Sequence, residues 1–262
     1  MNIRLVATDM DGTLLDSQKR LPVDFMDWVK NHPDIKTVIA SGRQYYTLVK
    51  DFLPIKERLI YVAENGGFVF ENDKILFRNV MKTEDVSDCL KLIDGIEGLT
   101  PVLCGEASAY MRKSKEHVLR EVEMYYARLQ ITQDLETAAH SDSVTKIAIF
   151  VDEKKAEAAT VHFSGIKHHL AAVLSGDSWI DISNRTVNKG AAVGVILQKY
   201  GIQKEEAMAF GDYLNDAQLL QSCGESYCME NGHPDLKALA KHMADSNDND
   251  GVMHVLRGIS HG

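Results

Sequence analysis

Two acidic residues one position apart are the first feature of this sequence with chemical potential. Asp9 and Asp11 follow the apolar run 3–8, and Gly12 comes directly after them. An apolar segment seldom ends on paired carboxylates unless charge is needed there. Asp and Gly are also ordinary turn residues, so this stretch taken alone is either a capped turn or a site.

Three further groups of polar residues occupy similar positions, because each follows an apolar run or opens a helical pattern. They are Ser41 with Gly42, then Lys189, and finally Asp212, Asn215 and Asp216 in the run GDYLND. Each group has an ordinary explanation when taken alone: a helix N-cap, a solvated surface lysine and a second N-cap. Their joint occurrence in this order favours a shared site.

The residue types indicate which chemistry such a site would perform. Carboxylates with no histidine or cysteine nearby suit Mg²⁺, which prefers oxygen ligands. A lysine, and a serine hydroxyl with free backbone N–H groups at a helix start, suit a phosphate. A metal beside a phosphate predicts phosphoryl transfer, in which an aspartate can act as the nucleophile and form an aspartyl-phosphate.

The elements that must position these residues read as alternating strands and helices. Apolar runs at 3–8, 37–40 and 59–63 alternate with helical patterns at 22–31 and 44–52, and the same rhythm returns after residue 189. This alternation predicts a parallel sheet. Because ligands gather at the carboxyl ends of parallel strands, we expect the polar residues to meet at one edge of that sheet.

The middle of the chain has a different pattern, with helices at 86–93 and 115–127 among short predicted strands. It reads as a small α+β unit with an antiparallel sheet. We therefore predict an α/β protein with a Rossmann-like parallel-sheet core domain of residues 1–81 and 185–262. Residues 82–184 form an inserted α+β domain in this prediction.

Composition narrows the class of protein. The 262 residues carry a net charge of −9, with 45% hydrophobic and 26% charged residues, so no basic excess favours nucleic acid or an anionic membrane. No apolar run reaches the roughly 20 residues that span a bilayer, and the N-terminus lacks a signal-peptide pattern. We expect a cytoplasmic protein whose four cysteines, which fit no zinc spacing, are reduced and buried.

The four groups of residues together resemble the haloacid dehalogenase-like phosphohydrolase superfamily along the whole chain. Its motifs are D-x-D-G-T, a Ser or Thr after a strand, a lysine, and G-D-x-x-N-D, here Asp9 to Thr13, Ser41, Lys189 and Gly211 to Asp216. The insertion resembles the α/β cap of the Cof-type subgroup. The stretches SGRQYY, AENGG and SAY are similar to bacterial sugar phosphatases of that subgroup, whereas SNRTVNKG departs from many relatives just before its valine.

This resemblance implies a role for each residue. Asp9 attacks phosphorus, and Asp11 protonates the leaving alkoxide and later activates water. Mg²⁺ is held by Asp9, the Asp11 backbone carbonyl and Asp212. The remaining roles are phosphate binding by Ser41, Gly42, Lys189 and Asn215, and orientation of Lys189 or a metal-bound water by Asp216.

The substrate implied is a small phosphorylated metabolite, with sugar phosphates favoured, and the cap is expected to select the leaving group. Candidate selectivity loops are 105–108 and 179–181, and Arg43 either contacts substrate or carries a surface charge. A phosphotransferase or phosphomutase on the same scaffold is the alternative, and a phospho-acceptor signalling domain is disfavoured by the long insertion. We expect a monomer or small homo-oligomer.

Overall fold

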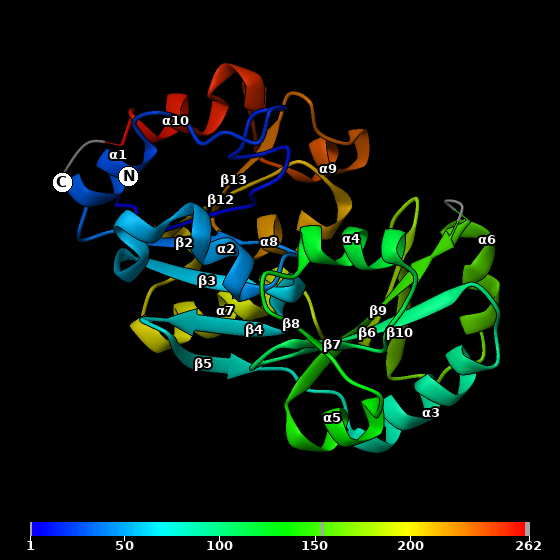
Figure 1. Ribbon diagram of the computed structural model, residues 1–262. Helices are drawn as coiled ribbons and strands as arrows, with labels where there is room; N and C mark the ends of the chain where they lie inside the picture. The colour runs from blue at the N-terminus through cyan, green and yellow to red at the C-terminus, as the bar shows by residue number, and fades with distance from the viewer. Residues whose placement is uncertain (1, 153–154, 260–262) are drawn as a thin grey trace. The chain divides into compact units, whose positions relative to one another are not determined.

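The computed structural model describes residues 2–152 and 155–259 and falls into two compact units (Figure 1). Residues 1–77 and 188–262 make up the first, which we call the core unit. Residues 78–187 make up the second, which we call the inserted unit. Each unit has its own sheet and its own apolar core.

The core unit is built on an eight-stranded sheet in the order β14-β13-β12-β1-β2-β3-β4-β5. Its strands are β1 (Leu5–Thr8), β2 (Lys36–Ala40), β3 (Leu59–Ala63), β4 (Phe68–Glu71), β5 (Lys74–Arg78), β12 (Ala207–Gly211), β13 (Glu225–Met229) and β14 (His242–Ala244). From β14 to β3 all neighbours are parallel, whereas β4 runs antiparallel to β3. The central strands β1, β3 and β12 are buried throughout, which explains their continuous apolar sequences.

Helices cover both faces of this sheet. On one face lie α1 (Phe25–Asn31), α2 (Tyr45–Asp51) and α10 (Gly251–Leu256), and on the other lie α7 (Lys189–Tyr200), α8 (Ala217–Ser222) and α9 (Pro234–Leu239). Helix α7 begins where the Asn188 side chain accepts a hydrogen bond from the Ala191 amide, and it ends at Gly201 in the left-handed conformation. These two signals fix where Lys189 stands on its helix.

The inserted unit has a six-stranded sheet in the order β10-β11-β9-β6-β7-β8. Its strands are β6 (Leu99–Gly105), β7 (Ala109–Met111), β8 (Leu129–Ile131), β9 (Val144–Val151), β10 (Leu170–Gly176) and β11 (Trp179–Asn184). The buried residues of α3 (Thr83–Asp94), α5 (Leu135–Ser141) and α6 (Ala156–Ala159) belong to one apolar cluster, and those of α4 (Glu116–Tyr125) belong to a second. The unit therefore has two separate apolar layers.

The predicted fold class, a parallel-sheet α/β core with an inserted α+β unit, is confirmed. One detail is wrong: the sheet of the inserted unit is antiparallel except for β7 and β8, which pair in parallel. The sequence patterns also missed β7, β8, α5, α6 and β14. Strands β7, β8 and β14 have three residues each and helix α6 has four, which is too short for a periodic signal to stand out, and Leu135 is the one large buried apolar residue of α5.

The sequence also predicted buried, reduced cysteines and no segment that spans a membrane. All four cysteines lie within the described residues, and each is a buried thiol, as predicted. Across residues 2–152 and 155–259, no helix combines the length and the apolar character that crossing a bilayer requires.

Candidate active site

The sheet topology brings three of the predicted segments to one edge. Asp9 follows β1, Ser41 follows β2, and Asp212 follows β12. Strand β1 pairs in parallel with both β2 and β12, so these three residues leave the sheet at neighbouring carboxyl ends. The backbone amide of Asp9 donates to the Phe210 carbonyl at 3.0 Å, which extends the β1–β12 pairing to Asp9 itself.

Lys189 is fully buried, although a lone lysine in a sequence is ordinarily a surface residue. Its Nζ lies 2.5 Å from Asp9 Oδ1 and 2.6 Å from Asp216 Oδ1. Burial by itself lowers the pKa of an ammonium group, but the carboxylates of Asp216 and Asp9 outweigh that effect and hold the pKa of Lys189 above its usual value. The site therefore keeps a permanent positive charge beside Asp9.

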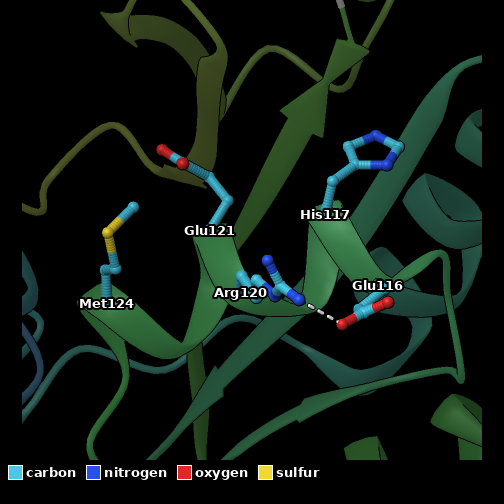
Figure 2. A pocket seen from close by; sticks show the side chains of 5 residues that line it. All are labelled: Glu116, His117, Arg120, Glu121 and Met124. Carbon is cyan, nitrogen blue, oxygen red and sulfur yellow. Dashed lines mark hydrogen bonds and ion pairs between the residues drawn. The ribbon is translucent and has the colours of Figure 1, made fainter.

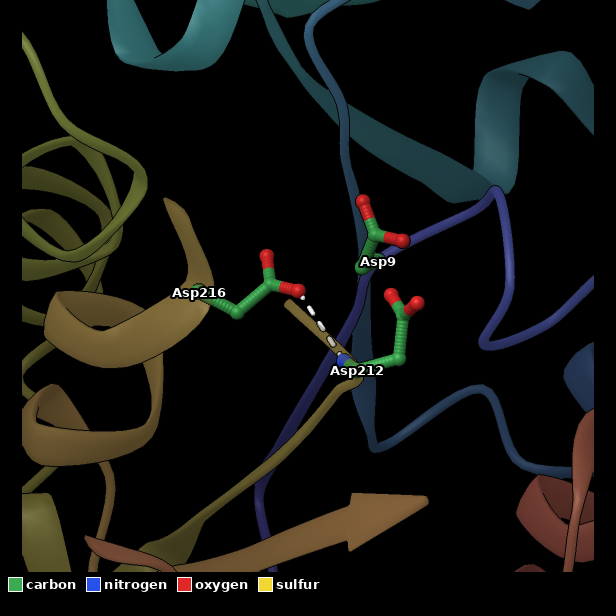
Figure 3. A group of neighbouring side chains, drawn as sticks. All are labelled: Asp9, Asp212 and Asp216. Atoms are coloured by element: carbon green, nitrogen blue, oxygen red, sulfur yellow. Dashed lines mark hydrogen bonds between the residues drawn. The ribbon is translucent and has the colours of Figure 1, made fainter. Parts of the chain in front are cut away.

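Asp216 connects this lysine to the loop after β12. One carboxylate oxygen accepts from Lys189, and the other accepts from the backbone amides of Asp212 at 3.1 Å and Tyr213 at 3.3 Å. Figure 3 shows the contact between Asp216 and the Asp212 amide. Both oxygens of Asp216 are thus engaged by protein groups, which favours a role in orienting Lys189 and the loop.

The carboxylates of Asp9, Asp212 and Asp216 form the acidic cluster of the site, with one oxygen of each lying within 4.8 Å of the others (Figure 3). Burial raises the pKa of Asp9 to about 8 against the opposing effect of Lys189, and Asp216 and Asp212 add to the rise. Burial also raises the pKa of Asp212 to about 6, and the Asp216 charge contributes. A buried and a half-buried carboxylate that both resist ionisation, with no nitrogen or sulfur ligand in the cluster, fit a hard divalent cation.

Two residues after the acidic pair shape the position of Asp212. Gly12 has φ +80°, and a Cβ built there would lie 2.4 Å from Asp212 Oδ2, so no other residue fits without displacing that carboxylate. The Thr13 hydroxyl donates to Asp212 Oδ1 at 3.1 Å. No role was predicted for Thr13, and its place in the D-x-D-G-T motif was the available signal.

The Asp11 side chain is held by two cations. Arg43 donates from Nε to Oδ2 at 2.8 Å and from Nη2 to Oδ1 at 2.6 Å, and Lys19 Nζ lies 2.7 Å from Oδ1. Burial pushes the pKa of Asp11 upward, but the hydrogen bonds and charges of Arg43 and Lys19 outweigh it and hold the pKa below its usual value. Arg43 is therefore a partner of Asp11, a role that neither sequence interpretation included, and Lys19 was missed.

The expected phosphate-binding residues are partly engaged already. The Ser41 amide donates to the Val62 carbonyl at 2.9 Å, and the Arg43 amide donates to Ser41 Oγ at 3.2 Å. The expectation of free backbone N–H groups is therefore wrong at Ser41 and Arg43, because sheet pairing continues past β2 and α2 begins only at Tyr45. Asn215 is exposed and donates to Asn65 Oδ1 at 3.3 Å.

A hollow of about 410 Å³ in the inserted unit does not coincide with these residues (Figure 2). Glu116, His117, Arg120, Glu121 and Met124 line it, all on α4, and an ion pair joins Arg120 to Glu116. None of the residues predicted from the sequence takes part. The selectivity roles expected for loops 105–108 and 179–181 stay predictions.

Comparison with known proteins places this site in a family. The profile of the haloacid dehalogenase-like hydrolases matches residues 6–256, from β1 to the last turn of α10. The chain belongs to the haloacid dehalogenase-like hydrolase family. All four motif segments, with Asp9, Ser41, Lys189 and the GDYLND run, lie inside the matched region.

Relatives in this family match over nearly the full length. The Escherichia coli 5-amino-6-(5-phospho-D-ribitylamino)uracil phosphatase YbjI is 31% identical over 98% of this chain and 96% of its own. A solved Streptococcus mutans protein is 28% identical, with a TM-score of 0.85 over 97% of this chain and 98% of its own. A Thermotoga maritima structure, 20% identical with a TM-score of 0.90, shares the fold over 99% and 98% of the two chains.

The haloacid dehalogenase-like hydrolase described here is an enzyme, and its place among phosphatases of the family makes it a phosphatase. The predicted resemblance to the Cof-type subgroup of this family is thereby confirmed.

Proposed function

We propose that this phosphatase is a Mg²⁺-dependent phosphomonoesterase that hydrolyses small sugar phosphates through an aspartyl-phosphate on Asp9. It acts in the cytoplasm, as a monomer or small homo-oligomer. The observation that carries the proposal is the placement of Asp9 beside the buried Lys189, next to Asp212, at the carboxyl end of a parallel strand. A nucleophile, a fixed cation and a further carboxylate thus share one edge of the sheet.

The metal would be held by Asp9, the backbone carbonyl of Asp11, and Asp212. The raised pKa values of Asp9 and Asp212 support this assignment, because a cation relieves the cost of burying their charges. When bound, Mg²⁺ neutralises the repulsion between the nucleophile and an anionic substrate and stabilises negative charge in the transition state.

The first half-reaction transfers the phosphoryl group to Asp9. A carboxylate oxygen of Asp9 forms a bond to phosphorus while the bond from phosphorus to the ester oxygen breaks, and Asp11 gives its proton to the departing alkoxide. Asp11 keeps a proton only when its two cationic partners withdraw, because Arg43 and Lys19 stabilise the ionised form. Release of Asp11 by these two residues therefore precedes protonation of the leaving group.

In the second half-reaction, the ionised Asp11 takes a proton from water, which attacks phosphorus and breaks its bond to Asp9. Inorganic phosphate leaves and Asp9 is restored. The low pKa of Asp11 in the structure suits this base step. One residue thus serves as acid and base in turn, with the ion pair favouring the base form.

The phosphoryl oxygens are bound by Lys189, Ser41, Gly42 and Asn215. Lys189 contributes charge, and Asp216 keeps the ammonium group aimed at Asp9. Because Lys189 is fully buried, it keeps one position and loses little entropy when substrate arrives.

The proposed substrate class has one line of support outside the site. The named substrate of the E. coli relative carries its phosphate on a ribityl group, a sugar-derived chain. A turnover screen tests the proposal: the full chain with Mg²⁺ is incubated with a panel of phosphorylated metabolites that includes sugar monophosphates and 5-amino-6-(5-phospho-D-ribitylamino)uracil, and inorganic phosphate is followed.

The outcomes of this screen separate the alternatives. Phosphate release that is fastest with sugar phosphates and requires Mg²⁺ supports the proposal. An isomerised sugar phosphate without release of inorganic phosphate indicates a phosphomutase instead. A phospho-aspartate that persists for minutes without turnover indicates a phospho-acceptor domain.

A further inference from the structure

The turn that follows β3 has an unusual backbone. Glu64, Asn65 and Gly66 have φ values of +50°, +55° and +102°, so three consecutive residues adopt positive φ and two of them carry side chains. Non-glycine residues in this region are strained, and such strain is concentrated at functional sites. The turn lies beside the segment after β2, because β2 and β3 are parallel neighbours.

Its backbone is attached to two other segments of the site. The Asn65 amide donates to the Ser41 carbonyl at 2.9 Å, and the Glu64 amide donates to the Arg43 carbonyl at 3.1 Å. At Gly66, a Cβ would lie 2.2 Å from the Asn188 carbonyl oxygen, directly before Lys189. The turn therefore touches both the Ser41 segment and the start of α7.

The Asn65 side chain reaches the remaining phosphate-binding residues. A Cβ built on Gly42 would lie 3.0 Å from Asn65 Nδ2, which shows that the carboxamide packs against that glycine. Asn65 Oδ1 accepts from Asn215 Nδ2 at 3.3 Å. This side chain thus connects two segments 23 and 150 residues away, and both carry groups assigned above to the phosphoryl oxygens.

We infer that Asn65 is a positioning residue that fixes Gly42 and Asn215 relative to each other around the phosphoryl group. The inference rests on the proposed function. The strained backbone aims the Asn65 carboxamide between the two segments. Asn215 is exposed on the 3-10 turn Leu214–Asp216, and its hydrogen bond with the carboxamide connects its side chain to the turn after β3.

The test separates the side chain from the backbone. Asn65→Gly keeps the left-handed conformation and deletes the carboxamide, because glycine adopts positive φ without strain. Asn72→Gly is the matched control, because Asn72 has φ +51° in the turn between β4 and β5. This substitution relieves the same kind of backbone strain at a position outside the acidic cluster. The measurements are kcat, KM, the inhibition constant of inorganic phosphate, and thermal unfolding.

We expect the Asn65→Gly protein to unfold at or above the unfolding temperature of the parent. Inhibition by phosphate should weaken, and kcat/KM should fall, each by about tenfold, which is the usual effect of losing one hydrogen bond that positions a group at a charged ligand. The Asn72→Gly substitution should leave the inhibition constant of phosphate and kcat/KM within about twofold of the parent values. Asn65→Asp keeps the shape of the side chain and adds a negative charge, so it should weaken phosphate inhibition further. This variant replaces Asn65→Gly in the test if the glycine variant folds poorly.

An Asn65→Gly protein that folds and retains parental kcat/KM and phosphate inhibition overturns the inference, whatever the parent's substrate. Failure of the proposed function is distinguishable, because then the parent protein itself turns over no phosphomonoester with Mg²⁺ and binds no inorganic phosphate in calorimetry.

Discussion

Arg43 holds Asp11 by two hydrogen bonds, from Nε to Oδ2 at 2.8 Å and from Nη2 to Oδ1 at 2.6 Å. This planar two-point contact fixes both the direction and the charge of the carboxylate. Asp11 is the residue assigned to proton transfer, so the contact connects the loop after β2 to the timing of both half-reactions.

Replacing Arg43 with lysine should lower kcat by about tenfold, because a point charge cannot reproduce the two-point contact that keeps Asp11 ionised and aimed for the base step of the second half-reaction. Phosphate release under saturating substrate measures the effect. Arg20→Lys is the control, because Arg20 Nε and Nη2 both contact Asp16 Oδ2 in the loop after β1, and 67% of the Arg20 side chain is exposed. Equal effects of the two substitutions would remove Arg43 from the mechanism.

Replacing Asp9 with asparagine should abolish turnover and leave the fold intact. The amide keeps the shape of the side chain but cannot form the phosphoryl bond, and it removes a buried carboxylate whose pKa is raised to about 8. Phosphate release and thermal unfolding are measured together. Residual activity above about one percent of the parent would contradict a nucleophilic role for Asp9.

Replacing Asp11 with asparagine should slow turnover by about two to four orders of magnitude, the usual contribution of a positioned acid or base. The loss should be greatest for alkyl phosphates and smallest for aryl phosphates, because a stable phenolate departs without a proton. Comparing the two substrate classes on the same variant provides the control. Parity with the parent on alkyl phosphates would exclude Asp11 from proton transfer.

Replacing Gly12 with alanine should impair metal-dependent activity, because the new Cβ would lie 2.4 Å from Asp212 Oδ2 at a φ of +80°. Gly98→Ala is the matched control: Gly98 has φ +84°, and nothing lies within 4 Å of its Cβ position. Both variants pay the same backbone strain, but only Gly12→Ala should lower the apparent Mg²⁺ affinity, measured by activity against metal concentration. Similar losses of affinity in both would show that strain alone is responsible.

Mg²⁺ should raise the unfolding temperature more at pH 8 than at pH 5. The folded pKa values of Asp9 and Asp212 are raised to about 8 and about 6, so the metal-free fold binds more protons than the unfolded chain between the usual value of 3.8 and these pH values. The contribution of these groups to stability therefore falls as pH rises through that window. A cation that replaces the protons restores it, most strongly where the carboxylates are ionised.

Thermal unfolding with and without Mg²⁺ across this pH range measures the effect. An Asp212→Asn variant should show a smaller Mg²⁺ shift at pH 8. A shift of the same size at every pH would argue against these two carboxylates as ligands.

Several features of this protein followed from the sequence by itself. The alternation of apolar runs and helical patterns predicted the parallel core sheet, and strand β3 begins and ends at the predicted residues. The order of Asp9, Ser41, Lys189 and the GDYLND run predicted that they meet at one sheet edge. Such patterns are local and periodic, so they can be read from the order of residues alone. Short elements such as β8 depend on pairing with another strand, and the sequence carries no local signal for them.

Only the tertiary structure decided the partners of the individual side chains. It buried Lys189 between Asp9 and Asp216, although the lysine and Asp9 are 180 positions apart. It also joined Arg43 to Asp11 and Asn65 to Asn215. No local pattern encodes these contacts, because a hydrogen bond depends on ångström-scale distances that are set when strands distant in sequence pair and pack.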